Sequence, residues 1–169
     1  MTVCIAAKFK GGVLCATDTA VTTGGTRLSM NDIKGFPLAG GFAMYAGTLY
    51  YAQEIRHAEG TDVRTRLKTV HEEHKEEADD DGCSLLSVTA KGDISIWEHY
   101  GSEVPMNDYA AIGSGADLAM FGLDLVYSPE RSEKWLREHI KNIIAKVERR
   151  DVMVFRPIKW YSVRIPPAK

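Results

Sequence analysis

The order of strand and helix patterns along the chain is the feature that most limits its fold. Two short β-prone segments, residues 3–9 and 13–18, flank Lys10-Gly11-Gly12, which predicts a tight hairpin turn. Lys91-Gly92 predicts a second hairpin in the same way. The predicted strands, in chain order, are 3–9, 13–18, one or two within 36–46, 83–89, 93–100, 109–112, 151–155 and 158–165. Between the second and third of these, the pattern predicts a loop at 22–26 and a mixed segment at 27–34.

Two pairs of helices separate these groups of strands. The first pair is predicted at 48–57 and from Asp62 to a stop at 79–82. The second pair is predicted from Gly115 to about Tyr127 and from a Ser132 cap onward. In the last helix the apolar residues recur at spacings of 4, 3 and 4, and these residues are Leu136, Ile140, Ile143 and Val147.

This order predicts two stacked antiparallel sheets covered by helices, an α/β layered arrangement within one domain spanning residues 1–169. No linker or composition shift divides the chain. A net charge of −2 gives no electrostatic footprint for nucleic acid, and no apolar run reaches the ~20 residues that cross a bilayer. Three cysteines, an odd number without metal-ligand spacing, indicate reduced thiols and favour a cytoplasmic location.

The N-terminus carries the most specific chemistry. The first residues lack the order of a secretory signal, so we expect the mature chain to begin at Met1 or, after removal of Met1, at Thr2. An N-terminal threonine carries its own general base, because its free α-amine can accept the hydroxyl proton as Oγ attacks a carbonyl. That amine has an ordinary pKa of ~7.7–8.0, and a nearby ammonium lowers it.

Asp18 and Lys34 are the candidates to complete such a site. Asp18 ends the second strand of the predicted N-terminal hairpin, so the hairpin can return it to a position beside Thr2. Lys34 follows Thr2 by 32 positions and supplies the ammonium. Taken singly, each residue is more often a turn residue or a solvated charge; their combination is what indicates a site.

Several motifs share a register with these residues. They are Thr2, Thr17-Asp18, Asn31-Asp32-Ile33-Lys34, Ala46-Gly47-Thr48, Ile112-Gly113-Ser114-Gly115 and the predicted strand at 151–155. In this register the chain resembles the proteasome β-subunits, and most closely their bacterial HslV type. The resemblance implies the four-layer αββα sandwich of the N-terminal nucleophile (Ntn) hydrolases. Many β-subunits have a serine and two glycines at the positions of Val154, Phe155 and Arg156. HslV-type sequences also lack that serine.

The resemblance also implies a role for each site residue. Thr2 is the implied nucleophile, and Lys34, held by Asp18, lies beside its hydroxyl. The backbone N–H of Gly47 is implied to line an oxyanion hole. Ser114 is implied to hydrogen-bond near the threonine amine, with Asp151 supporting it. No cofactor is implied.

The implied function is a threonine endopeptidase subunit of a homo-oligomeric ring acting on proteins or peptides, with an ATPase unfoldase as possible partner. Two alternatives remain open. One is an Ntn hydrolase of small amides, for which 169 residues leave little room to build a pocket. The other is a non-catalytic ring or scaffold protein that retains Met1, since a preceding residue displaces the amine from Thr2.

Other motifs have simpler explanations. Gly113-Ser114-Gly115 lacks the lysine and glycine spacing of a P-loop. His71 and His74 are one residue short of the zinc-protease spacing, and a solvated helix face explains them better. HslV-type sequences are expected to bind a sodium ion through backbone carbonyls near the strand at 151–155; with Arg150 and Arg156 there, the resemblance leaves the metal content open. The acidic run 72–81 is typical of a solvated helix end. Asp32 and Val21 fall near positions that line the specificity pocket in the family, without fixing a preference.

Overall fold

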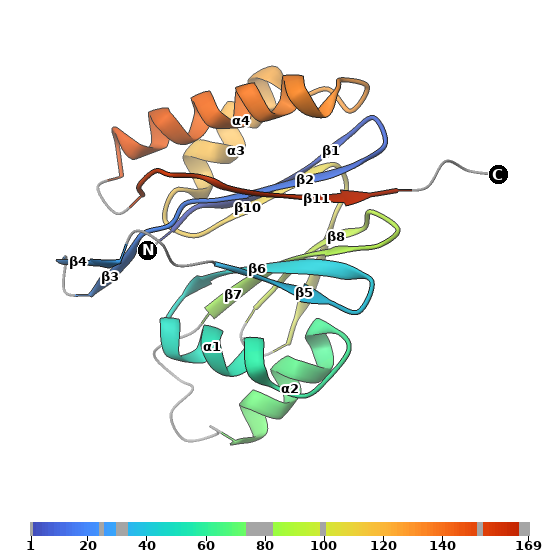
Figure 1. The fold of residues 1–169 in the computed structure, drawn as a ribbon, viewed down its shortest axis with the longest axis vertical. Helices are drawn as coiled ribbons and strands as arrows, with labels where there is room; N and C mark the ends of the chain where they lie inside the picture. The colour runs from blue at the N-terminus through green and yellow to red at the C-terminus, as the bar shows by residue number, and fades with distance from the viewer. Residues whose placement is uncertain are drawn as a thin grey trace.

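The computed structural model describes residues 2–23, 26–29, 34–73, 83–98, 101–151 and 154–165 (Figure 1). Within these ranges the chain is an α+β protein with two antiparallel sheets of four and five strands, a separate two-stranded β3–β4 pair and four helices. The strands are β1 (Cys4–Phe9), β2 (Gly12–Thr17), β3 (Val21–Thr23), β4 (Thr26–Ser29), β5 (Gly35–Leu38), β6 (Gly41–Gly47), β7 (Cys83–Thr89), β8 (Ile94–Trp97), β9 (Glu103–Met106), β10 (Tyr109–Ile112) and β11 (Lys159–Arg164). The helices are α1 (Leu49–His57), α2 (Val63–Glu73), α3 (Ala116–Val126) and α4 (Glu133–Glu148).

The first sheet has the order β10-β1-β2-β11, and the second has the order β5-β6-β7-β8-β9. The predicted N-terminal hairpin is confirmed: β1 and β2 pair from Phe9↔Gly12 to Cys4↔Thr17. Gly11 lies in its turn with φ +100°, a conformation that glycine adopts without strain. The register pairs the start of β1 with the end of β2, so Thr2, two residues before β1, and Asp18, directly after β2, lie at the same end of the hairpin.

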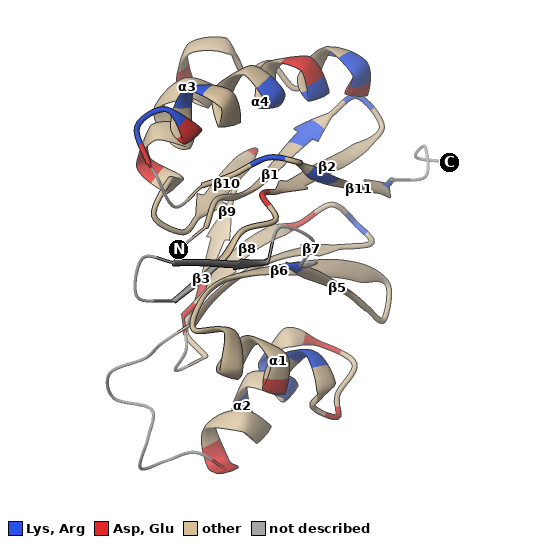
Figure 2. Cartoon of the chain, turned by 60° about the vertical axis from the view of Figure 1, so that its left-hand side comes forward, with Lys and Arg blue, Asp and Glu red and all other residues tan. Residues whose placement is uncertain are grey.

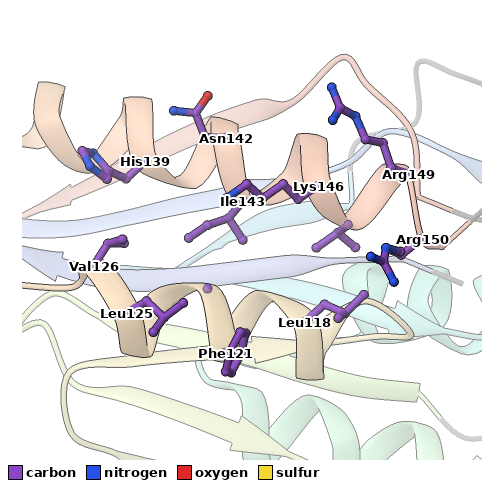
Figure 3. A pocket seen from close by; sticks show the side chains of 12 residues that line it. Leu118, Phe121, Leu125, Val126, His139, Asn142, Ile143, Lys146, Arg149 and Arg150 are labelled. Atoms are coloured by element: carbon purple, nitrogen blue, oxygen red, sulfur yellow. The ribbon is translucent and has the colours of Figure 1, made fainter.

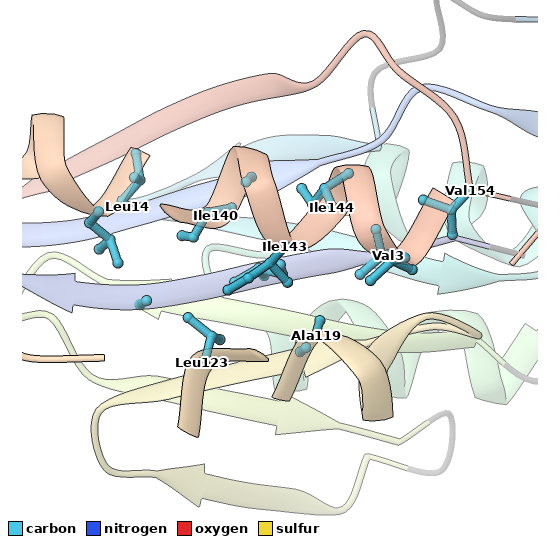
Figure 4. Packing of buried hydrophobic residues seen from close by; sticks show 14 of the residues in the cluster. Val3, Leu14, Ala119, Leu123, Ile140, Ile143, Ile144 and Val154 are labelled. Carbon is cyan, nitrogen blue, oxygen red and sulfur yellow. The ribbon is translucent and has the colours of Figure 1, made fainter. Parts of the chain in front are cut away.

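Side chains of β1 alternate between two apolar clusters. Val3 and Ile5 belong to an outer cluster with residues of α3 and α4, such as Leu123 and Ile140 (Figure 4). Cys4 belongs to an inner cluster with residues of the second sheet. A third cluster joins the second sheet to α1 and α2. Both faces of β1 are therefore buried, and each sheet has a pair of helices packed against it (Figure 1).

The predicted helices are confirmed within the described ranges. Ser132 caps α4, because its hydroxyl oxygen accepts a hydrogen bond from the Trp135 N–H at 3.2 Å. The predicted stripe of α4 is buried, from Leu136 to Val147. The proposed stop of α2 at 79–82, and His74, lie outside the described residues. Charged residues gather on the helices and at the strand ends (Figure 2). None of the described helices combines the length and apolar character needed to cross a bilayer.

The prediction of a strand at 151–155 is wrong for the residues that the structure describes there. Asp151, Val154 and Phe155 lie outside any strand. The Asp151 N–H donates to the Val147 carbonyl, continuing the end of α4. The backbone of Phe155 forms hydrogen bonds with the loop after β2 and not with a neighbouring strand. Its N–H donates to the Asp18 carboxylate, and its carbonyl accepts from the Thr19 N–H. β11 is the strand that closes the first sheet.

Three strands were not predicted. β3 and β4 form a hairpin where the sequence indicated a loop and a mixed segment, because the glycines there suggested irregular structure. β9 contains Pro105, which argues against a strand interior. The structure places β9 at the edge of the second sheet, the position where a strand tolerates proline.

All three cysteines are buried and free, as the composition suggested. Burial raises the pKa of Cys4, Cys15 and Cys83 from 9.0 to about 12.

An acid with a higher pKa in the folded chain loses its proton more readily on unfolding. We therefore expect the free energy of unfolding to fall as the pH rises from about 9 toward 12. Urea unfolding at several pH values in this interval measures how the free energy of unfolding changes with pH. This free energy should fall less steeply with pH in a Cys83→Ala variant than in the natural chain. Identical slopes would contradict the prediction.

Candidate active site

Thr2 and Asp18 meet at the open edge of the β1–β2 hairpin. The Asp18 N–H donates to the Val3 carbonyl at 3.2 Å, and the Val3 N–H donates to Asp18 Oδ1 at 3.1 Å. These two bonds extend the hairpin pairing by a residue beyond Cys4↔Thr17. Thr2 is 3% exposed and Asp18 is fully buried. The hairpin therefore fixes the nucleophile candidate and the carboxylate relative to each other.

Lys34 joins them from the second sheet. It precedes β5, and its carbonyl accepts a hydrogen bond from the Tyr45 N–H of β6 at 3.1 Å. Its Nζ donates to Thr2 Oγ1 and, at 3.0 Å, to Asp18 Oδ1. Lys34 is itself only 3% exposed. The ammonium is thus held between a hydroxyl and a carboxylate in a site largely shielded from water.

The Asp18 carboxylate has a full set of donors. Oδ1 accepts from the Val3 N–H and Lys34 Nζ. Oδ2 accepts from the Ala20 N–H at 3.2 Å and the Phe155 N–H at 3.4 Å. A buried carboxylate is tolerated when a cation and backbone donors satisfy it in this way. Asp18 is therefore suited to hold a buried lysine in one position.

The turn after β10 fixes the backbone of Thr2. Gly113 has φ +97°, and a Cβ added there would lie 2.1 Å from the Thr2 carbonyl oxygen. The Gly115 N–H donates to the same oxygen at 3.3 Å. Gly113 is needed for both its conformation and its close approach to Thr2. The predicted Gly-Ser-Gly motif thus contacts the predicted nucleophile residue through its glycines.

Gly113→Ala is expected to destabilise the fold and displace Thr2. Gly11→Ala is a matched control, because Gly11 has nearly the same φ, +100°, with no atom within 4 Å of the added Cβ. The control should lose about 1–2 kcal/mol from backbone strain alone. Gly113→Ala should lose more in urea unfolding, because a backbone oxygen must move. Equal losses for both variants would show that the approach to Thr2 is not restrictive.

Ser114 and Asp151 form a second pair. Ser114 Oγ donates to Asp151 Oδ2 at 2.5 Å, so the segment after α4 and the β10–α3 turn are joined next to the glycines that contact Thr2. Gly47 ends β6 with φ +124°, two residues beyond Tyr45. None of the hydrogen bonds among the described residues links Gly47 or Ser114 directly to the Thr2 side chain. Their implied roles stay predictions.

Sequence reasoning missed the backbone donors around Asp18. The N–H groups of Ala20 and Phe155 depend on how the loop after β2 and the segment before β11 approach each other. The Thr19 hydroxyl adds a bond to the Pro157 carbonyl at 3.1 Å between the same segments. Backbone groups leave no signature in residue types, so no sequence pattern could have found them.

The arrangement places an ammonium and a carboxylate beside the Thr2 hydroxyl, the groups that a hydroxyl nucleophile requires. In the described part of the chain, no three histidine, cysteine or acidic side chains gather as a metal site. Asp32, a specificity candidate from the sequence, lies outside the described residues.

No protein-family model matches this chain, and a search of curated proteins returned no significant match. The geometry around Thr2 is therefore the basis for assigning a function.

Proposed function

We propose that the chain is an N-terminal threonine hydrolase, with Thr2 as nucleophile after removal of Met1. The observation that carries the proposal is the buried Lys34 ammonium, which donates to Thr2 Oγ1 while Asp18 holds it. The two sheets and their helix pairs are proposed to be the αββα sandwich of the Ntn hydrolases. The proteasome-like register of the motifs supports this, and the HslV type is the proposed family.

In the proposed first step, the Thr2 α-amine accepts the hydroxyl proton, directly or through a water molecule. Oγ1 attacks the carbonyl carbon of an amide, while the Lys34 ammonium stabilises the developing negative charge on Oγ1. The C–N bond then breaks, and the leaving amine takes the proton. Water hydrolyses the resulting ester, which releases the acid and restores the threonine.

The remaining roles are proposed from the resemblance. The Gly47 N–H would stabilise the oxyanion of the tetrahedral intermediate. The Ser114–Asp151 pair would orient the α-amine, since Ser114 lies between the two glycines that contact Thr2. The proposed substrates are proteins or peptides, cleaved in the cytoplasm by a homo-oligomeric ring with an ATPase unfoldase as candidate partner.

Two measurements test the proposal. The intact mass of the protein from its native host should be smaller than the full-length value by one methionine residue. The same material should cleave a panel of peptide amides faster than a panel of small acyl amides. A mass that retains Met1 would overturn the mechanism and favour a scaffold role. Faster cleavage of small acyl amides would keep the nucleophile but replace the substrate class.

A further inference from the structure

The buried side chains that can act on Lys34 lie between the two sheets. The groove between α3 and α4 is elsewhere: it lies on the helix side of the first sheet, where Leu118, Phe121 and Leu125 leave an apolar stripe of α3 exposed (Figure 3). The inner cluster, in contrast, joins β1 to the second sheet, from which Lys34 comes. A buried group that acts on this lysine is therefore a member of the inner cluster.

Cys4 is the residue of the inner cluster nearest in sequence to Thr2. Its side chain is fully buried, and its thiol donates a hydrogen bond to the Tyr45 carbonyl at 3.3 Å. Cys4 begins β1 of the first sheet, and Tyr45 lies in β6 of the second. This hydrogen bond therefore connects the two sheets.

Tyr45 also holds the backbone of Lys34. Its N–H donates to the Lys34 carbonyl at 3.1 Å, just before β5 begins. One residue of β6 thus contacts Cys4 through its carbonyl and Lys34 through its N–H. Thr2 and Asp18 belong to the hairpin of the first sheet, whereas Lys34 approaches from the second sheet. The spacing of the sheets at Tyr45 therefore decides whether the ammonium reaches both groups.

The charges of the site act on the Cys4 thiol. The pKa of Cys4 is raised mainly by burial, while the Lys34 ammonium lowers it and the Asp18 carboxylate raises it. The pKa of Cys15 is raised by burial and then by Cys4, and not by the charges of the pair. Cys4 is therefore close to the Lys34–Asp18 pair, and Cys15 is farther away although it belongs to the same cluster.

The surroundings of Cys4 exclude a role as a second nucleophile. The thiolate is the reactive form of cysteine, and a pKa of about 12 leaves almost no thiolate at neutral pH. A fully buried thiol is also closed to a substrate. Any contribution of Cys4 to the reaction therefore acts through another residue.

We propose that Cys4 is a positioning residue for Lys34. Its bond to Tyr45 fixes the spacing of the sheets, and its sulfur fills the space beside the flexible lysine side chain. Lys34 Nζ is thereby kept within hydrogen-bond distance of Thr2 Oγ1 and Asp18 Oδ1. The effect on catalysis rests on the proposed function, but the position of the ammonium can be measured without any activity.

Three variants separate the positioning role from simple packing. Cys4→Ala removes the donor and the sulfur, and Cys4→Ser restores a donor at the same position. Cys15→Ala is the matched control, because Cys15 is equally buried and its thiol forms no hydrogen bond within the described part of the chain. Should Cys4→Ala not fold, Cys4→Thr and Cys4→Val form a second pair of nearly equal shape, with and without a donor.

The exchange of the Lys34 ammonium protons with water tests the position of the lysine. In ¹⁵N-labelled protein this exchange should be slow, because the group is buried and hydrogen-bonded, and its signal is identified by its loss in Lys34→Arg. We expect Cys4→Ala to speed the exchange at least about tenfold, and Cys4→Ser and Cys15→Ala to change it less than about twofold. An ammonium that exchanges in the natural chain as fast as a surface lysine, unchanged exchange in Cys4→Ala, or equal acceleration in Cys15→Ala would overturn the proposal.

Kinetics test the consequence for the proposed reaction. The kcat of Cys4→Ala should fall about tenfold with KM nearly unchanged, because the ammonium acts on the attacking oxygen and not on binding. The acidic limb of kcat/KM should move to higher pH, because the Thr2 amine must be neutral and a more distant ammonium lowers its pKa less. Cys15→Ala should change neither quantity. An active natural chain whose Cys4→Ala variant keeps its kcat and pH profile would contradict the role of Cys4. A natural chain without hydrolytic activity, but with the expected proton exchange, would instead remove the proposed function and leave the positioning of Lys34 supported.

Discussion

Thr2→Ala is expected to reduce peptide hydrolysis on the order of 10⁴-fold while leaving the fold intact. Alanine removes the proposed nucleophile, and the contacts of the Thr2 backbone carbonyl with Gly115 are kept. Loss of a nucleophile in a hydrolytic site leaves only the contributions of substrate binding and oxyanion stabilisation. The measurement is the kcat/KM of a peptide amide, with intact mass confirming that Met1 is removed from both proteins.

Thr2→Ser is the matched control. Serine keeps an Oγ that can accept from Lys34 and keeps the free amine, so we expect activity well above that of Thr2→Ala. Unfolding curves of the three proteins should nearly coincide, which separates catalysis from stability. A Thr2→Ala protein that still cleaves the peptide at the natural rate would exclude Thr2 as the nucleophile.

Asp18→Asn is expected to lower the free energy of unfolding by about 3–5 kcal/mol. The substitution preserves the shape of the side chain but leaves the buried Lys34 ammonium without its counter-charge. Removing one partner of a buried ion pair is costly for this reason. It also turns an acceptor oxygen into a donor NH₂ group toward backbone N–H groups that donate already. Urea unfolding at neutral pH measures the loss.

A double-variant cycle separates the ion pair from the rest of the site. Lys34→Met alone leaves Asp18 as an uncompensated buried carboxylate, and the pair Asp18→Asn with Lys34→Met removes both charges. The double variant should be more stable than the sum of the two single losses predicts. Glu72→Gln is the surface control, because its pair with Lys68 is solvent-exposed and should matter little. Additive losses in the cycle would contradict a coupled buried pair.

Much of the secondary structure follows from local patterns. The Lys-Gly-Gly turn and its flanking apolar segments predict the β1–β2 hairpin, and the observed register agrees. The Ser132 cap and the spacing from Leu136 to Val147 predict α4 in the same way. Local reasoning failed at 151–155, where Phe155 forms its backbone bonds with the loop after β2. A strand needs a partner in the ladder, and the partner lies far away in the sequence.

The candidate site likewise has one part that the sequence predicted and another that only the structure supplied. Residue type and spacing identified Thr2, Asp18 and Lys34 as candidates, because a nucleophile needs a cation and the cation needs a carboxylate. The structure brings the three together through a hairpin and a second sheet. The donors from Ala20 and Phe155, and the contact between Gly113 and the Thr2 carbonyl, are backbone features. They depend on chain path and not on residue chemistry.

The sequence by itself determined the N-terminal hairpin, the two pairs of helices and the chemical groups available near its first residues. Hydrophobic spacing and turn residues act over a few positions, so a pattern in the sequence reports them directly. The tertiary structure alone decided that Lys34 crosses from the second sheet to a buried hydroxyl, and that α3 leaves an apolar stripe exposed. Both depend on how elements distant in sequence pack against one another, which is set by the total burial of apolar surface and not by any local pattern.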